Sequence, residues 1–337
     1  MSATKEQPLR YAITAWVIAG CLLLLTLQLK LLPALLAGLL VYELVHVIAP
    51  RLPWTREGGG KIAAVTLLVI AIVGLLTLLL FGIVAFLRSD AGSLPRLLQK
   101  MAEIVESSRD KLPTWLVDTI PGDPDALKGV TIEWLREHAR ELRTLGGEIG
   151  HVIAHILIGM VIGAVVSFHE ARPTHDGGPL ARALSERARR VGEAFRRVVF
   201  AQIRISALNT LFTAIYLVGV LPLLGIHLPF AKTLVVLTFI VGLLPVVGNL
   251  VSNTVIVVVS LSVSLAVASA SLVFLIVVHK LEYFLNARIV GAQIRASPWE
   301  LLLAMLLMEA AFGIPGLIAA PIYYAYLKDE LAARGLV

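Results

Sequence analysis

The chain has 337 residues, of which 58% are hydrophobic and 15% charged, and its mean hydropathy is +0.87. A soluble domain is about half apolar and a quarter charged, so this composition predicts a polytopic membrane protein and excludes a large soluble enzyme. The net charge of +6 comes from basic residues in short segments between apolar runs. Such residues orient membrane helices and contact anionic lipids, so no nucleic-acid partner is expected.

No cofactor or metal site is expected. Cys21 is the single cysteine and lies within the first apolar run, which excludes an intrachain disulfide and a cysteine-based zinc or iron–sulfur site. Glu148, His151 and His155 would share one helix face, but their order differs from the metalloprotease motif and no further ligand is identifiable. A glycine-rich phosphate loop, a nucleophile elbow and a catalytic triad spacing are also missing from the sequence. The chain is therefore not expected to be an enzyme.

Residues 1–87 are predicted to hold a transmembrane hairpin, at 11–29 and 31–49, and a third span. A short basic loop between the hairpin and the third span places that loop and the N-terminus in the cytoplasm by the positive-inside rule. Residues 88–148 are polar and acidic and are expected outside, as a helical hairpin domain. Its first helix is indicated by an apolar stripe at Leu94, Leu97, Leu98, Met101, Ile104 and Val105.

The fourth predicted span, 149–169, is followed by a basic cytoplasmic linker at 170–202. Apolar residues recur every three to four positions in this linker, which predicts an amphipathic helix on the cytoplasmic leaflet. The alternative is an ordinary basic helix packed on the bundle. The predicted lipid-contact residues are Arg182, Arg189, Arg190, Arg196 and Arg197.

Residues 203–328 form the predicted transport core, and within it 233–278 carries no charged residue. Two crossings fit there, interrupted between Gly242 and Asn249, where a membrane helix is expected to break. Irregular backbone in a bilayer is tolerated only where it is buried in protein or lines a water-filled cavity, so this break is a candidate transport path. The alternative is a plain turn at the membrane surface. The path candidates are Pro245, Gly248, Asn249, Asn253 and, further along the chain, Arg288.

The last predicted span covers about 299–327 and is expected to be kinked or discontinuous. Its middle supplies the further path candidates Gly313, Pro315 and Gly316. Eight crossings would place both termini and the tail at 329–337 inside, but they would put the basic segment around Lys280 outside, against the charge rule. A re-entrant hairpin in place of two crossings would move this segment inside and the C-terminus outside.

Charged residues at membrane depth are a second group of candidates. A carboxylate at mid-membrane costs roughly 2.5–3.5 kcal/mol, so Glu309 is interpreted either as a proton- or cation-handling group or as one partner of an ion pair, with Arg204 as the other. Glu43 and His46, three positions apart on one helix face, are interpreted either as a second proton- or cation-handling site or as an interfacial anchor near the cytoplasmic end. Glu282 belongs to a charged cluster directly after the uncharged stretch 233–278, which would form an ionic gate or cap the membrane boundary.

Three motifs follow one another in the C-terminal half: Gly242-Leu-Leu-Pro-Val-Val-Gly-Asn249, Leu281-Glu-Tyr-Phe-Leu-Asn-Ala-Arg-Ile-Val-Gly291 and Phe312-Gly-Ile-Pro-Gly316. Their order resembles the autoinducer-2 exporter (AI-2E) family of bacterial membrane proteins. The resemblance implies an inner-membrane permease with about eight spans, from a family linked to export of autoinducer-2 and, in some members, to exchange of sodium or lithium for protons. The family often has a glycine pair where Met308-Glu309-Ala310 stands, so Glu309 is a departure from its pattern.

The sequence therefore predicts an all-α, polytopic helical membrane protein with about eight spans, a broken or re-entrant helix and a small extracytoplasmic helical domain. The expected function is export of a small polar solute, such as a signalling molecule, with Glu309 coupling transport to protons or monovalent cations. The alternatives are a sodium or lithium/proton antiporter and a non-transporting membrane scaffold. The expected location is the bacterial inner membrane, and the outer hairpin offers a surface for a homo-oligomer.

Overall fold

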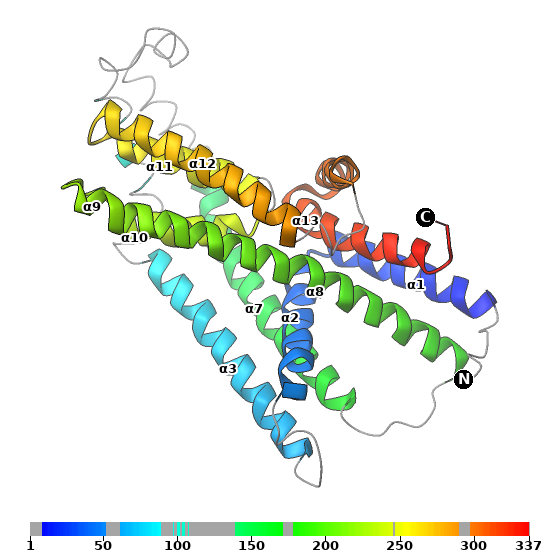
Figure 1. Cartoon of the computed structure of the whole chain (residues 1–337). Helices are drawn as coiled ribbons and strands as arrows, with labels where there is room; N and C mark the ends of the chain where they lie inside the picture. The colour runs from blue at the N-terminus through cyan, green and yellow to red at the C-terminus, as the bar shows by residue number, and fades with distance from the viewer. Residues whose placement is uncertain are drawn as a thin grey trace. The chain divides into compact units, whose positions relative to one another are not determined.

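The computed structural model describes residues 9–51, 61–88, 139–170, 178–244, 247–289 and 297–336, together with single positions between 97 and 107. The regular structure within these residues is entirely helical (Figure 1). Six of the described helices are long and apolar enough to cross a membrane. The predicted all-α polytopic membrane protein is therefore confirmed.

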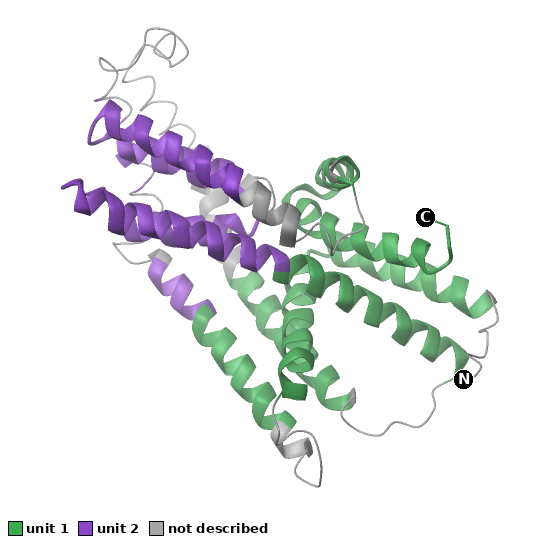
Figure 2. Ribbon diagram, viewed as in Figure 1, with its two compact units in different colours: residues 1–79, 149–200, 293–337 green, residues 80–148, 201–292 purple. Residues whose placement is uncertain are grey.

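The chain divides into two compact units (Figure 2). Unit 1 comprises residues 1–79, 149–200 and 293–337, and unit 2 comprises residues 80–148 and 201–292.

Unit 1 contains the predicted N-terminal hairpin as two helices, α1 (Leu9–Gln28) and α2 (Leu32–Ile48), joined by a tight turn in which Lys30 has a positive φ of 56°. A short 3₁₀ turn, η1 (Ala49–Arg51), follows α2. The remaining helices of unit 1 are most of α3 (Lys61–Arg88), most of α7 (Ala139–Glu170), the first part of α8 (Pro179–Ala214) and α13 (Pro298–Ala332).

Small residues bring α2 and α7 into backbone contact. A Cβ atom added to Gly159 would lie 2.1 Å from the carbonyl oxygen of Ala34, and one added to Gly163 would lie 2.2 Å from that of Gly38. Each helix contributes two small residues four positions apart, which places them on one face. In a bilayer, helices associate by close van der Waals packing, and small residues allow this close approach.

The basic linker at 170–202 and the fifth span, predicted as a separate segment at about 203–223, form one continuous helix. α8 runs from Pro179 to Ala214 and continues through a π-helical turn, η4 (Ile215–Val220), into the short α9 (Leu221–Leu223). The change from charged to apolar composition near residue 202 marks no break because residues 200–205 contain neither glycine nor proline. The basic part of α8 is therefore an extension of an apolar helix.

Unit 2 contains the end of α3, the start of α7 and the end of α8 with η4 and α9. Its other helices are α10 (Ala231–Gly242), α11 (Val247–Leu261) and α12 (Leu265–Ile289). Its apolar core includes Leu217, Leu234, Ile256 and Val259, and Leu97 from the predicted outer segment is buried in the same core. Ile104 is also buried, whereas Lys100 and Glu103 are exposed, so the predicted apolar stripe is confirmed at the positions that the structure describes.

The kink predicted in the last apolar run is confirmed, and it is a reversal of direction. Gly313 has non-helical angles, φ 63° and ψ −148°, and separates two arms at 298–312 and 314–332 (orange and red in Figure 1). The Glu300 carboxylate lies 2.7 Å from the Lys328 ammonium. At 1.5 Å per residue both positions are roughly 20 Å from the kink, so this contact requires the arms to fold back against each other. α13 is a helical hairpin.

Candidate transport path

The helix interruption predicted between Gly242 and Asn249 is confirmed, because α10 ends at Gly242 and α11 begins at Val247. The two helices meet at Gly248, where an added Cβ would lie 2.2 Å from the carbonyl oxygen of Val241. No side chain fits at that distance, so the close approach of α11 to α10 requires glycine. Pro245 lies outside the described residues.

Polar side chains of α8 bind the carbonyl groups at the end of α10. The Gln202 side-chain amide donates a hydrogen bond of 2.7 Å to the carbonyl of Gly242, and the Ser206 hydroxyl donates one of 2.7 Å to that of Phe239. A helix that ends within the protein leaves its last carbonyls without intrahelical partners. Gln202 therefore supplies a partner at the position where α10 breaks, which stabilises the irregular backbone.

On the other side of the break, Asn209 of α8 pairs with Asn249 of α11. The Asn209 amide donates to the Asn249 side-chain oxygen at 2.9 Å, and Asn209 is buried. A side-chain amide carries both donors and acceptors, so this pair can exchange hydrogen bonds with a polar ligand. Asn253, one turn further along α11, is half-buried.

These residues belong to a polar stripe on one face of the α8–η4 helix. Its members recur every three to four positions and are Gln202, Ser206, Asn209, Thr213 and Tyr216. Thr213 is 1% exposed, and within the described part of the chain its hydroxyl has no hydrogen-bond partner. The Tyr216 hydroxyl lies 3.0 Å from that of Ser271, which lies 2.8 Å from that of Ser260. The stripe and these partners carry hydroxyl and amide groups and no charge.

The path candidates on α13 form the turn of its hairpin. Gly313 has the positive φ given above, and a Cβ added to Gly316 would lie 1.9 Å from the carbonyl oxygen of Met308. Pro315, between them, is half-buried. The three residues thus allow the chain to reverse direction. They belong to unit 1, whereas the polar stripe belongs to unit 2. That the α13 turn and the polar stripe line the same transport path remains a prediction.

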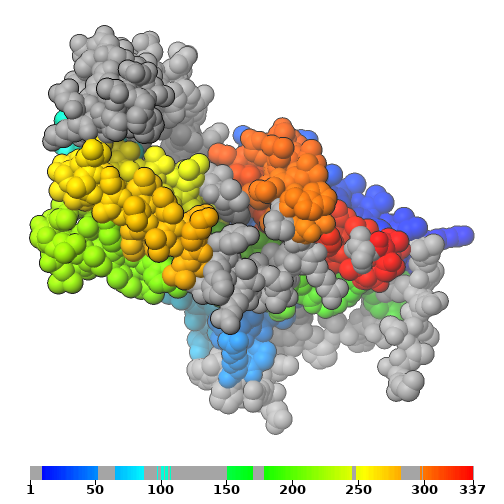
Figure 3. All heavy atoms as spheres, turned by 45° about the horizontal axis from the view of Figure 1, so that its top comes forward, coloured from blue at the N-terminus to red at the C-terminus, as the bar shows by residue number. Residues whose placement is uncertain are grey.

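Glu309 lies on the first arm of α13 and is exposed. This arm forms part of the visible surface in Figure 3, where it is orange. Arg204 is also exposed and lies in unit 2. Pairing between Glu309 and Arg204 therefore remains a prediction, and the side chains of Glu282 and Arg288 lie outside the described residues.

Glu43 and His46 make local contacts within unit 1. The buried Glu43 carboxylate lies 3.5 Å from the Arg196 guanidinium of α8, and a Cβ added to Gly192 would lie 2.7 Å from a Glu43 oxygen. The exposed His46 ring lies 4.1 Å from the Tyr42 ring, and its Nδ1 is 2.9 Å from the Tyr42 carbonyl oxygen. Glu43 thus connects α2 to α8, and its role as a proton- or cation-handling group or as an interfacial anchor remains a prediction.

An ionic cluster that the sequence did not indicate joins α8 to the second arm of α13. The Glu330 side chain is 5% exposed and lies 3.3 Å from Arg187 and 3.1 Å from Arg190, and it accepts a 2.9 Å hydrogen bond from the Trp16 indole. Arg197 pairs with Asp329 in the same region. Of the predicted lipid-contact residues, Arg189, Arg190, Arg196 and Arg197 form ion pairs within unit 1. Arg182, Arg189 and Arg196 are exposed.

Comparison with known protein families identifies the family to which the chain belongs. A family model described as AI-2E family transporter matches residues 11–333, nearly the whole chain. No curated protein sequence matches it. The match includes the broken α10–α11 segment, the polar stripe and the α13 hairpin. The chain belongs to the AI-2E transporter family and is a multi-pass membrane transporter.

Proposed function

We propose that the polar stripe and the α10–α11 break form the binding site for a small, neutral, polar solute, which the protein exports across the bacterial inner membrane. The observation that carries the proposal is the pairing of Asn209 with Asn249 beside a helix break, near the Thr213 hydroxyl, which has no hydrogen-bond partner among the described residues. Amide and hydroxyl groups recognise hydroxylated solutes by exchanging hydrogen bonds. Broken membrane helices are where transporters commonly bind substrate.

The chemistry of the stripe favours a neutral solute over an ion. An anion would be expected to meet arginine, lysine or free helix N-termini, and a cation to meet carboxylates or free carbonyl groups. The stripe itself is uncharged, and the carbonyls of Phe239 and Gly242 already accept side-chain hydrogen bonds. A solute with several hydroxyl groups, such as a sugar-like signalling molecule, matches this set.

Coupling to protons or monovalent cations is assigned to Glu309. This carboxylate is exposed on an apolar helical arm, four residues before the reversal at Gly313. Ionisable groups within membrane segments carry a free-energy cost and are commonly proton or ion carriers. In an alternating-access cycle Glu309 would take up a proton on one side and release it on the other. If the cation itself is the substrate, the same residue serves a sodium or lithium/proton antiporter.

The proposed topology has six crossings and two re-entrant hairpins. α10 has 12 residues and the first arm of α13 has 15, which at 1.5 Å per residue are about 18 and 22 Å, less than the ~30 Å hydrocarbon core. If α10–α11 and α13 each return to the side from which they enter, α12 becomes a crossing from outside to inside. Lys280 and the C-terminal end then both face the cytoplasm, in agreement with the positive-inside rule.

Cysteine labelling tests this topology. Cys21 would be replaced by serine, and single cysteines introduced by Lys280→Cys or Arg334→Cys would be exposed to a membrane-impermeant maleimide in right-side-out and everted vesicles. Both positions are exposed. The proposal expects labelling of both in everted vesicles only. Labelling of the two positions from opposite sides would contradict it, because an odd number of crossings would then separate them.

Transport is tested in proteoliposomes loaded with labelled autoinducer-2, comparing the native chain, Asn249→Leu and Thr254→Leu. Thr254 is an exposed α11 residue that bonds to its own helix backbone, so Thr254→Leu is the matched control. Loss of one or two hydrogen bonds worth ~1 kcal/mol each predicts an efflux rate roughly tenfold lower for Asn249→Leu and unchanged for the control. Equal rates for all three proteins would contradict the site. A non-transporting scaffold predicts no protein-dependent efflux at all.

Proton coupling is tested separately in everted vesicles with an imposed pH gradient followed by a fluorescent dye. Sodium, lithium, potassium and autoinducer-2 would be added in turn to native protein and to Glu309→Gln. A gradient collapse that one of these compounds induces and the variant loses supports coupling through Glu309. Identical responses at every pH would exclude that role for Glu309 and would not affect the proposed site for a neutral solute.

The predicted homo-oligomer through the outer hairpin concerns residues that lie mostly outside the described part of the chain.

A further inference from the structure

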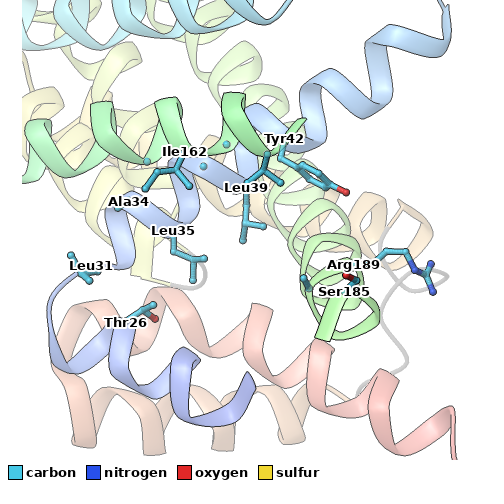
Figure 4. Close-up of a pocket in the computed structure, with 14 residues that line it drawn as sticks. Thr26, Leu31, Ala34, Leu35, Leu39, Tyr42, Ile162, Ser185 and Arg189 are labelled. Carbon is cyan, nitrogen blue, oxygen red and sulfur yellow. The ribbon is translucent and has the colours of Figure 1, made fainter. Parts of the chain in front are cut away.

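A groove lies between α1, α2, α7 and α8 in unit 1 (Figure 4). Its volume is about 480 Å³, within the ~300–1,000 Å³ range of sites that hold small molecules. It is separate from the polar stripe, and its lining residues all belong to unit 1.

The groove exists because its floor is made of small residues. Ala34, Gly38, Gly159 and Gly163 are the residues that bring α2 and α7 into backbone contact, and all four line the groove. No large side chain can rise from these positions without separating the two helices. The hollow is thus a consequence of the α2–α7 crossing.

The lining is apolar along most of the groove and polar at one end. Figure 4 shows Leu31, just before α2, followed by Leu35 and Leu39 on α2. Tyr42 of α2 and Ser185 and Arg189 of α8 lie toward the end opposite to Leu31 and Thr26. Among the described residues that line the groove, none is acidic. The groove is therefore complementary to an amphiphile whose polar head group accepts hydrogen bonds.

Arg189 gives the polar end a positive charge and a donor. Its guanidinium makes three hydrogen bonds to Glu186 and one to Glu193 along the α8 surface. A guanidinium has five N–H donors, so at least one remains for a further acceptor. Its side chain is 56% exposed, and exposed pairs of this kind contribute little, so they compete weakly with a phosphate for Arg189.

We propose that this groove binds one anionic phospholipid, with the phosphate at Arg189, Ser185 and Tyr42 and an acyl chain along the leucines of α2. The charge of Arg189 at the polar end suits a phosphate, and the leucine lining suits a lipid tail. The basic first part of α8, with six arginines and two glutamates between 179 and 199, is predicted to lie at the cytoplasmic leaflet, where anionic lipids are available.

The test uses the full-length protein reconstituted in vesicles of equal parts phosphatidylglycerol and phosphatidylcholine. After extraction into detergent and removal of loose lipid, the lipids retained per chain are counted by mass spectrometry. The proposal expects one phosphatidylglycerol per chain, retained in preference to phosphatidylcholine. Equal retention of both lipids would overturn it.

Two pairs of variants locate the lipid. Arg189→Gln removes the charge at the polar end, and Ala188→Trp fills the groove beside it; Arg182→Gln and Ala181→Trp are controls at exposed positions of the same helix that do not line the groove. Arg189→Gln is expected to lower phosphatidylglycerol retention about tenfold, or ~1.4 kcal/mol. Ala188→Trp is expected to abolish it, while both controls retain the lipid.

Other outcomes would overturn the proposal. Equal loss in Arg182→Gln and Arg189→Gln would indicate a diffuse basic surface. Unchanged retention in Ala188→Trp would place the lipid elsewhere. A changed subunit number in Ala188→Trp with unchanged lipid would indicate that a second copy covers the groove. Because Ala188 and Arg189 are exposed, these variants should fold, which circular dichroism and size-exclusion elution can verify.

Discussion

Replacement of Gly248 by alanine tests the close approach of α10 and α11. The added Cβ would lie 2.2 Å from the Val241 carbonyl oxygen, whereas ordinary contact begins at 3.4 Å, and the Gly242 Cα is only 2.9 Å away. Both neighbours are backbone atoms, so α11 must move away from α10 by about 1 Å. This overpacking costs ~3 kcal/mol at the upper end of its range, and alanine in a helix gains ~1 kcal/mol over glycine, which leaves a net loss of about 2 kcal/mol.

The assay is thermal unfolding of the purified protein in detergent. At ~2 °C per kcal/mol for a chain of this size, Gly248→Ala should lower Tm by about 4 °C. Gly74→Ala in α3 is the matched control, because no atom lies within 4 Å of its added Cβ, and its Tm should stay level or rise. Equal Tm values for the two variants would refute the backbone contact between α10 and α11.

Three further variants test the rest of the fold. Gly163→Ala places a Cβ 2.2 Å from the Gly38 carbonyl oxygen, and should lower Tm by several degrees as α2 and α7 separate; an unchanged Tm would mean that the helices are not in contact. Gly313→Ala puts a side chain at φ 63° and should cost about 1–3 kcal/mol in the same assay, and a stability equal to that of the native chain would contradict the reversal. Glu330→Gln leaves Arg187 and Arg190 without their shared carboxylate and should destabilise the protein by ~3–5 kcal/mol. Thermal unfolding at low and high ionic strength should show that this loss of stability depends little on salt. A loss of stability that high salt removes would indicate a solvent-exposed ion pair.

The membrane class and the helix break were predictable because both depend on local composition. Apolar runs of about 20 residues identify membrane helices without any knowledge of their neighbours. Likewise, Gly242 and Pro245 interrupt an apolar run, and the structure ends α10 at Gly242. The continuity of α8 was missed because a change of composition was interpreted as a boundary, although residues 200–205 contain no helix breaker.

The polar stripe was harder to predict because isolated hydroxyl groups in membrane helices carry little information. Thr238 and Thr254 bond to carbonyls of their own helices, which needs no partner elsewhere. Ser206 instead bonds to Phe239 on another helix. The sequence signal that distinguishes it is its regular spacing from Gln202 and Asn209.

Pairings between distant residues could not be read from the sequence. Many arginines lie between 179 and 199, and local pattern does not say which of them meets Glu330, which lies more than 130 residues away. The direction of α13 presents the same problem, because Gly313 and Pro315 fit a mild kink as well as a reversal. The contact between Glu300 and Lys328 is what distinguishes the two.

A single oxygen of Glu300 fixes the register of the α13 hairpin. It accepts hydrogen bonds from the Ser297 backbone N–H, from the Tyr324 hydroxyl and from Lys328, so it caps its own arm and holds the opposite one. Each residue of a helix turns the chain by roughly 100°, so deleting one residue from an arm would turn Glu300 away from Lys328. Among natural variants of this chain, insertions and deletions should therefore be rare within 301–312 and 314–327, whereas substitutions on the exposed faces of the same arms should be common.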